Sequence, residues 1–286
     1  MGKFSKSSNF WKVVATNYDS FCKLALSLPP KKTLMKLLGL IGYPLGHSFS
    51  KPYFNKKFEE LGIADAWHYE SFPIDNIEKL TDILRGHPEL IGLNVTIPYK
   101  EAVMRFVDTF DDSAAEIGAV NCIDMRNSQL KGYNTDAYGF EKSVLGLLNT
   151  PDLESLLNLN LKALILGTGG ASKAVAYTLK KWHIPFHFVS RTRSETSLSY
   201  KDIDKEIMTT HHLIVNTTPL GMSPNTEGCP LLPFQYIGNQ HFMYDLVYNP
   251  VITQFLKRGL DNRASTKNGL DMLYFQAERG WEIWNT

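Results

Sequence analysis

The sequence predicts an α/β fold made of two α/β domains, and three observations predict it. Short apolar runs of strand length alternate with segments whose apolar residues recur at helical spacing. This alternation occurs in two series, one from residue 37 and one from residue 163. The length of 286 residues also exceeds that of one average domain. Strands that alternate with helices are typical of βαβ units and parallel sheets.

The first series contains two expected strands, residues 37–41 and 67–72, each followed by an expected helix. The first helix places three residues on one face: Phe54, Phe58 and Leu61. The second helix is marked by four spaced residues: Ile74, Ile77, Thr81 and Leu84. Two strand–helix pairs in succession favour parallel pairing of the strands.

The second series begins with an expected strand at residues 163–166, and its later strands are expected at 186–189, 213–215 and 242–246. The helix after its first strand has three residues at core spacing: Val175, Leu179 and Trp182. This order of elements is typical of a doubly wound nucleotide-binding domain.

Two more helices are expected, one between the series and one at the end. Residues 138–148 would connect the series, ahead of Pro151 and a leucine-rich stretch. Residues 270–284 would form the last helix, with a stripe of five residues: Leu273, Tyr274, Ala277, Trp281 and Trp284.

The composition excludes several classes of protein. With 30 Lys and Arg against 29 Asp and Glu, the chain has no electrostatic footprint for nucleic acid or an anionic membrane. Cys22, Cys122 and Cys229 lack any CxxC spacing, so we expect neither a disulfide framework nor a metal site, and the thiols suit a reducing cytoplasm. No apolar run approaches the ~18 residues of a membrane span. We expect a cytoplasmic protein whose partner is a small molecule.

The first 34 residues are basic, with Asp19 as their only acidic residue, and they lack the compact apolar core of a secretory signal. We expect residues 1–36 to be a poorly ordered N-terminal extension.

A glycine-rich turn directly follows the expected strand at 163–166 and directly precedes a helix. The turn reads Gly167-Thr168-Gly169-Gly170-Ala171-Ser172. Gly167 permits the tight turn, and Gly169 and Gly170 let the backbone approach a pyrophosphate at the helix N-terminus. An ordinary glycine turn is the alternative, but the flanking strand and helix favour dinucleotide binding.

The end of the next strand indicates which dinucleotide is bound. It offers no Asp or Glu for a ribose 2′-hydroxyl, and it presents Ser190, Arg191, Thr192 and Arg193 instead. Two guanidinium groups and two hydroxyls suit a 2′-phosphate. A solvated basic turn is the other interpretation, and NADP is favoured over it.

Residues 91–100 alternate strictly, with Ile, Leu, Val and Ile at odd positions and Gly, Asn, Thr and Pro at even ones. This period of two predicts a strand with one apolar and one small, polar face, stopped by Pro98. Lys100 then lies just past the carboxyl end of the strand, where open α/β sheets bind ligands. A surface lysine at the start of a helix is an equally good interpretation of this stretch alone.

Two other short stretches carry polar groups near element ends. Thr135 and Asp136 precede the helix expected from residue 138, where such residues routinely act as N-caps. A carboxylate there is also stabilised by the helix dipole and could face a lysine ammonium group. Ser48 and Ser50 follow the first expected strand, although that signal is weak alone.

Taken together, these segments resemble the shikimate dehydrogenase family, from about residue 37 to the end of the chain. The glycine turn and Gln276 match, and so do eight other motifs in the order of the family: GYP (42–44), HSFS (47–50), NVTIPYK (94–100), GAVN (118–121), GYNTDAYG (132–139), NTTPLGM (216–222), DLVYNP (245–250) and NGLDML (268–273).

The resemblance implies a substrate domain with a mixed, mainly parallel sheet, formed by residues 37–137 and 268–286. A Rossmann-type NADP-binding domain, residues 138–267, would be inserted between these segments. The implied activity is the reversible NADPH-dependent reduction of 3-dehydroshikimate to shikimate in aromatic amino acid biosynthesis, by a monomer or a homodimer.

The resemblance also implies residue roles. Lys100 and Asp136 would flank the reacting C–O bond as the catalytic pair. Six residues would bind substrate. Its carboxylate would be held by Ser48, Ser50 and Tyr248, and its ring hydroxyls would be contacted by Thr96, Asn121 and Gln276. Thr217 would contact the cofactor and Gly269 would lie near the nicotinamide.

The chain departs from the family pattern at three places. Lys51 displaces the usual proline to Pro52, Ser190 replaces the usual asparagine, and the usual later basic residue is Arg193 or absent. Two rival functions remain: a quinate/shikimate dehydrogenase that uses NAD, and a shikimate-sensing module without turnover. The missing acid after Val189 counts against the first rival, and retention of Lys100 and Asp136 counts against the second.

Overall fold

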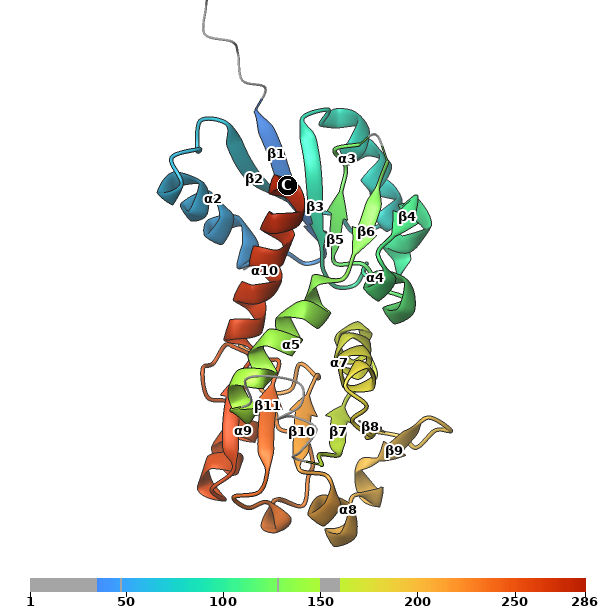
Figure 1. The fold of residues 1–286 in the computed structure, drawn as a ribbon, viewed down its shortest axis with the longest axis vertical. Helices are drawn as coiled ribbons and strands as arrows, with labels where there is room; N and C mark the ends of the chain where they lie inside the picture. The colour runs from blue at the N-terminus through green and yellow to red at the C-terminus, as the bar shows by residue number, and fades with distance from the viewer. Residues whose placement is uncertain (1–34, 47, 128, 150–159) are drawn as a thin grey trace, which may run out of the picture.

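The computed structural model describes residues 35–46, 48–127, 129–149 and 160–286. Residues 1–34 of the expected extension, and Pro151 with the stretch up to residue 159, lie outside the described residues. The expected end of the extension at residue 36 is wrong, because the first strand begins at Lys36. Two six-stranded sheets form the frame (Figure 1). The first sheet lies in the upper half of that view and the second in the lower half, with helices α5 (Thr135–Leu148) and α10 (Leu270–Asn285) running between them.

The first sheet is mixed, as expected. Its six strands are β1 (Lys36–Gly42), β2 (Trp67–Pro73), β3 (Leu90–Val95), β4 (Thr109–Phe110), β5 (Cys122–Asp124) and β6 (Lys131–Tyr133), in the order β2-β1-β3-β5-β6-β4. The strand β1 is parallel to β2 and β3, and β4 is parallel to β6, whereas β5 runs antiparallel to both of its neighbours. The strands expected at 37–41 and 67–72 are therefore confirmed as β1 and β2.

The helical elements of this half are α2 (Ser50–Glu60), η1 (Ile77–Lys79), α3 (Leu80–Gly86), η2 (Ala102–Phe106) and α4 (Asp112–Ile117). Phe54 and Phe58 are buried on α2 as predicted. The prediction for Leu61 is wrong: α2 ends at Glu60, and Leu61 caps it with 52% of its surface exposed. Ile74 is buried but precedes the first helical turn, which begins at Ile77.

Helix α5 begins three residues before the expected residue 138. The side chain of Asn134 accepts a hydrogen bond from the Ala137 N–H and so acts as the N-cap. Thr135 and Asp136 consequently lie in the first helical turn, so the expectation that they precede the helix is wrong. The expected domain boundary at 137/138 falls inside this helix.

The second sheet is entirely parallel. Its strands are β7 (Ala163–Leu166), β8 (Phe186–Ser190), β9 (Ser197–Ser199), β10 (Leu213–Asn216), β11 (Phe242–Asp245) and β12 (Ser265–Asn268). Their order, β9-β8-β7-β10-β11-β12, is the strand order of a Rossmann fold. Each strand expected in this half is present, and the sheet confirms the doubly wound prediction.

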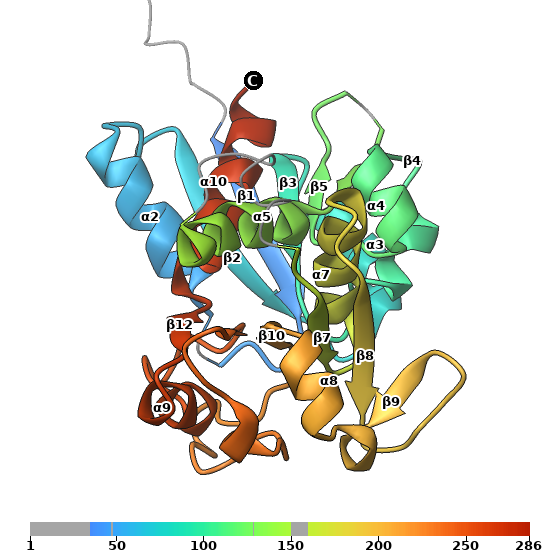
Figure 2. The ribbon, with the colours of Figure 1, turned by 60° about the horizontal axis from the view of Figure 1, so that its bottom comes forward.

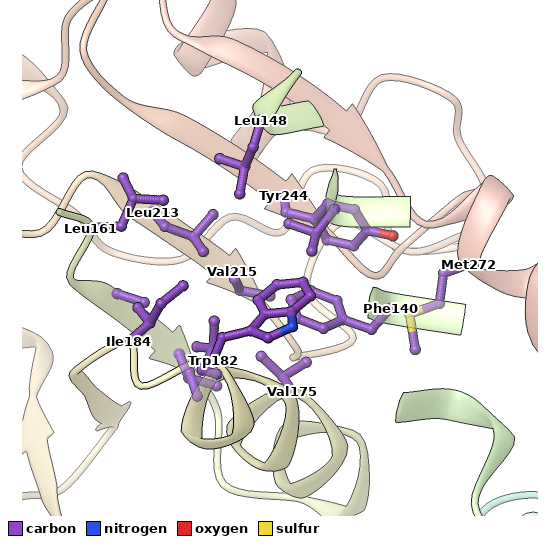
Figure 3. Close-up of a cluster of buried hydrophobic side chains, with 14 residues drawn as sticks. Phe140, Leu148, Leu161, Val175, Trp182, Ile184, Leu213, Val215, Tyr244 and Met272 are labelled. Atoms are coloured by element: carbon purple, nitrogen blue, oxygen red, sulfur yellow. The ribbon is translucent and has the colours of Figure 1, made fainter. Parts of the chain in front are cut away.

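Alternate residues of the central strands enter two separate cores. Ile165 and Val215 pack with α5 and α7 (Gly170–Lys181), where the side chains of Phe140, Trp182 and Tyr244 converge (Figure 3). Residues that point to the other face pack with the remaining helices: α8 (Lys205–Thr210), η4 (Phe234–Tyr236) and α9 (Gln254–Asp261). A short turn, η3 (Tyr200–Asp202), follows β9. None of the helices in the described part of the chain is both long and apolar enough to cross a membrane.

The last helix returns to the first sheet. Helix α10 lies beside α5 (Figures 1 and 2), and Trp284 Nε1 donates to the carbonyl oxygen of Ile123 at 2.9 Å. Gly92 leaves room for that indole, because a Cβ there would lie 2.2 Å from Trp284 Nε1. Most of the predicted stripe is buried, but Tyr274 is 41% exposed and packs edge-on against Phe49.

Arg126 fastens the end of α10 to the first sheet. Its guanidinium donates to the carbonyl oxygens of Ile283 and Trp284 at 2.6 and 3.0 Å, and it pairs with both oxygens of the buried Asp124 carboxylate at 2.8 and 2.9 Å. Burial raises the pKa of Asp124, but the hydrogen bonds and charge of Arg126 outweigh this and hold that pKa below its ordinary value.

We expect Arg126→Ala to lower the free energy of unfolding by about 2–3 kcal/mol, because it leaves a buried carboxylate unpaired and frees two helix carbonyls. Urea unfolding at pH 7 measures this. Arg105→Ala, which breaks an exposed pair with Glu78, is the control and should cost under about 0.5 kcal/mol. Because the pKa of Asp124 is lowered by folding, its stabilisation is present above the unfolded-state pKa of about 3.9 and is lost below it. Equal losses in the two variants would contradict the role of Arg126.

Candidate active site

Two adjoining cavities lie at the carboxyl ends of the strands. The first has a volume of 570 Å³ and is lined from both halves of the chain, and the second, of 810 Å³, runs along the glycine turn. Ile97, Lys100 and Ala171 line both cavities, so the two spaces meet at Lys100.

The first cavity brings together all eight residues expected to bind substrate or act in catalysis. They come from the segment after β1, the segment after β3, the turn before β5, the start of α5, the segment after β11 and helix α10: Ser48, Ser50, Thr96, Lys100, Asn121, Asp136, Tyr248 and Gln276. They converge because the carboxyl ends of β1, β3 and β11 face one space. The cavity therefore carries hydroxyl, amide, ammonium and carboxylate groups within a largely apolar wall.

Lys100 and Asp136 form an ion pair inside this cavity, with 2.6 Å between Nζ and Oδ2. Their side chains are only 19% and 11% exposed, which shows that Lys100 is not a surface lysine. The turn at Pro98 directs Lys100 inward, and the first turn of α5 carries Asp136 at the positive end of the helix dipole, which stabilises a carboxylate. The pair can hold and pass a proton beside a bound molecule.

Asn121 fixes the carboxylate from its other side. Its amide nitrogen donates to Asp136 Oδ1 at 2.9 Å, and its amide oxygen accepts from the Thr135 N–H at 2.7 Å. Thr135 Oγ1 in turn lies 3.4 Å from Gln276 Oε1 on α10. Both oxygens of Asp136 are therefore engaged, and its orientation is set before any ligand binds.

A hydrogen-bonded pair at the wall of the first cavity was not expected from the sequence: Asn94 lines the cavity, and Tyr69 bonds to it. The Tyr69 hydroxyl donates to Asn94 Oδ1 at 2.7 Å, and the amide of Asn94 donates to the Asn121 carbonyl oxygen at 3.3 Å. Burial raises the pKa of Tyr69 well above its ordinary value, so this hydroxyl keeps its proton. The period-two alternation placed Asn94 on the same face as Thr96, and that was the only signal for it.

The glycine turn forms one wall of the second cavity, through Gly167, Gly169, Gly170 and Ala171. Gly167 has φ of +110°, and a Cβ there would lie 2.7 Å from Thr217 Oγ1, so no other residue fits without strain. Because Gly169 is the N-cap of α7 and has no side chain, the first N–H groups of that helix stay open to the cavity. This cradle fits a pyrophosphate.

The end of β8 contributes only part of its expected set. Ser190 and Arg191 line the second cavity, but Thr192 and Arg193 do not. The guanidinium of Arg193 lies 3.4 Å from Asp202 Oδ1, which turns it away. Tyr200 also lines this cavity, and no sequence pattern pointed to it.

Thr217 and Gly269 complete the expected set in different places. Thr217 lines the second cavity and donates to the Leu166 carbonyl oxygen at 2.7 Å. Gly269 lines the first cavity, at the start of α10, where a Cβ would lie 2.2 Å from the Leu246 carbonyl oxygen. Only glycine permits this approach of β11 to α10.

Comparison with known proteins agrees with this architecture. Residues 40–123 match the family model for the shikimate dehydrogenase substrate binding domain. The NADP(+) shikimate dehydrogenase of Methanococcus maripaludis is 35% identical over 268 residues, which cover 88% of this chain and 92% of that protein.

Two solved structures have the same fold. The shikimate dehydrogenase of Aquifex aeolicus superposes with a TM-score of 0.76 and 31% identity, over 90% of this chain and 94% of that one. The shikimate dehydrogenase of Thermus thermophilus, solved in complex with NADP(H) and shikimate, superposes with a TM-score of 0.74 and 29% identity, over 87% of this chain and 93% of that one. This chain therefore belongs to the shikimate dehydrogenase family.

Proposed function

We propose that this protein catalyses the NADPH-dependent, reversible reduction of 3-dehydroshikimate to shikimate, a step of chorismate and aromatic amino acid biosynthesis. The observation that carries the proposal is the Lys100–Asp136 pair at the junction of the two cavities. Relatives at about 35% identity are NADP(+) shikimate dehydrogenases, and one solved relative holds both NADP(H) and shikimate.

NADPH, when bound, supplies the hydride for the ketone carbon. The Lys100 ammonium group donates a proton to the ketone oxygen, and in the reverse direction its neutral amine accepts the proton of the hydroxyl. Asp136 Oδ2 accepts from Nζ at 2.6 Å, which orients the lysine, and the carboxylate also binds the neighbouring substrate hydroxyl. The apolar wall of the cavity limits water around the pair, which strengthens these charge interactions.

The remaining groups in the first cavity suit the other parts of the substrate. The hydroxyls of Ser48, Ser50 and Tyr248 donate to the substrate carboxylate. Burial raises the pKa of Tyr248, so its hydroxyl remains a donor at neutral pH. The side chains that bind the ring hydroxyls are Thr96, Asn121 and Gln276, each able to donate or accept.

The second cavity suits NADP. Its glycine turn, Gly167, Gly169, Gly170 and Ala171, would hold the pyrophosphate, and Thr217 would contact the cofactor from the segment after β10. Ser190 and Arg191 would hold its 2′-phosphate, and Thr192 and Arg193 would be the outer residues of this phosphate site, because Asp202 holds Arg193 outside the cavity. Gly269, which lines the first cavity, would lie beside the nicotinamide.

The functional division of the chain follows from these sites. Residues 37–137 with 268–286 form the substrate part and residues 138–267 the NADP part, from which Tyr248 reaches into the first cavity. The protein acts in the cytoplasm as a monomer or homodimer.

Assays of shikimate and quinate, each with NADP and with NAD, test the activity. We expect shikimate with NADP to give the highest kcat/KM. Greater activity with quinate and NAD would favour the rival dehydrogenase, and absence of turnover with all four pairs would favour a sensing module.

Arg191→Ala should raise the KM for NADP about tenfold, because it removes a charge-assisted contact with the 2′-phosphate. The KM for NAD, which lacks that phosphate, is the internal control and should stay nearly constant. Arg193→Ala should raise the KM for NADP less, since Asp202 holds that side chain outside the cavity. Equal losses with NADP and NAD would show that Arg191 is structural.

Lys100→Ala should lower kcat by ~10²–10⁴-fold while NADP affinity and folding persist, because it removes the proton donor. Asp136→Asn keeps the size and removes the charge, so it should also reduce kcat and weaken shikimate binding. Steady-state kinetics with circular dichroism measure both effects. Turnover by Lys100→Ala within a few-fold of the parent would contradict the catalytic role.

A further inference from the structure

A cluster of buried polar side chains lies at the carboxyl ends of β10 and β11, outside both cavities. Asn216, Asp245 and Thr253 are almost completely buried there. None of them lines either cavity, and the proposed chemistry uses none of them.

The Asp245 carboxylate is the centre of this cluster. Its Oδ1 accepts from Asn216 Nδ2 at 2.9 Å and from the Val247 N–H at 3.0 Å, and its Oδ2 accepts from Thr253 Oγ1 at 2.6 Å. No basic side chain pairs with it among the residues that the structure describes. The carboxylate therefore accepts three hydrogen bonds without a neutralising cation.

One branch of the cluster controls the segment after β10. Asn216 Oδ1 accepts from the N–H and the hydroxyl of Thr218, at 3.1 and 2.7 Å. Thr218 lines the second cavity, and Met222, later in the same segment, lines the first. The position of this segment thus affects both spaces.

The other branch controls the segment after β11. Val247, whose N–H bonds to Asp245, lies between Leu246 and Tyr248, which both line the first cavity. The two segments also meet directly, because the Ser223 N–H donates to the Asn249 carbonyl oxygen at 3.0 Å.

We propose that Asp245 is a positioning residue that holds these two segments in one arrangement, so that the contacts to substrate and to dinucleotide are set together. This inference rests on the proposed function. Asp245 acts through Thr218 on the dinucleotide side and through Tyr248 on the substrate side, and it touches neither ligand.

The charge of Asp245 is costly for folding. Burial raises the pKa of this carboxyl to about 6, and hydrogen bonds from Thr253, Val247 and Asn216 only partly offset that effect. Between pH about 4 and about 6 the folded state keeps a proton that the unfolded state has lost, so stability falls as the pH rises. If position 245 served stability alone, an uncharged side chain would serve it better than this carboxylate. The three fixed hydrogen-bond donors around the carboxylate indicate instead that it positions the segments that carry them.

Two other titratable groups interact electrostatically with Asp245. They are Tyr244 on the same strand and the half-buried Cys229, and burial raises the pKa of both. Both are neutral between pH 5 and 8. A change in stability between pH 5 and 8 is therefore attributable to Asp245 if the Asp245→Asn substitution abolishes that change.

The experiment compares four variants of the full chain by steady-state kinetics, by NADP affinity from tryptophan fluorescence and by melting temperature. Asp245→Asn removes the charge, and Thr253→Val removes one donor to it. Thr253→Ser keeps that donor and the N-cap of α9, so it is the conservative rescue. Asp204→Ala removes an N-cap of α8, away from both cavities, and so controls for loss of stability alone.

We expect Asp245→Asn and Thr253→Val to raise the KM for shikimate and the KM for NADP together, each by about tenfold, with a smaller change in kcat. Thr253→Ser should restore both, and Asp204→Ala should lower the melting temperature with both KM values unchanged. The stability lost in Asp245→Asn, relative to the parent, should be smaller at pH 8 than at pH 5.

A rise in only one KM, or a lower melting temperature with both KM values within twofold of the parent, would overturn the inference. A parent protein that does not oxidise shikimate with NADP would refute the proposed function instead. NADP affinity would then decide the inference alone: weaker binding in Asp245→Asn supports it, and unchanged binding overturns it.

Discussion

The site depends on the close crossing of α5 and α10. At Gly139 a Cβ would lie 2.6 Å from the carbonyl oxygen of Met272 and 3.1 Å from the backbone nitrogen of Gln276, so the backbones of the two helices approach closely. Asp136 lies one turn before Gly139 on α5, and Gln276 faces it from α10. Because a larger side chain at Gly139 would push the helices apart, this contact keeps Gln276 of α10 in the first cavity together with Asp136 of α5.

Within that frame, Asn121 transmits the geometry of the first sheet to the reacting groups. Its backbone oxygen accepts from the Val95 N–H and from the Asn94 amide, while its side chain holds Thr135 and Asp136. One residue thus links β3, the turn before β5 and the start of α5. These hydrogen bonds join buried groups, so breaking one would leave a buried polar group without a partner, which is costly. This cost makes the arrangement specific.

The sequence predicts the elements with strong periodicity and a clear boundary. The strand at residues 163–166 has the bounds expected, because four apolar residues directly precede a glycine turn. The strands β4, β5 and β6 have two or three residues each, too few to show a period. The start of α5 was misplaced because Asn134, Thr135 and Asp136 can all act as caps, and only the hydrogen bond to Ala137 distinguishes them.

A site residue could be predicted from the sequence where it directly follows a strand. It could not be predicted where tertiary contacts determine the position or the partner of its side chain. Spacing placed Lys100 past a strand end, but its partner Asp136 lies 36 residues away, and the pairing came from resemblance to a family. Arg193 looked equivalent to Arg191 in the sequence, yet Asp202 turns it aside. Tyr69 gave no signal, because its importance comes only from its hydrogen bond to Asn94.

The halves also touch along α7, and the strength of that contact can be compared with the helix crossing. Lys173 and Lys180 of α7 pair with Glu101 and Glu116 of the first half at 2.9 and 2.6 Å. These side chains are substantially exposed, so solvent screens each pair and each contributes little to the cohesion between the halves. The apolar part of the contact is made largely of alanines, which bury little area. The α7 contact therefore fixes the position of the glycine turn relative to Lys100, because it holds the neighbouring residue Glu101. The α5–α10 crossing supplies the cohesion between the halves.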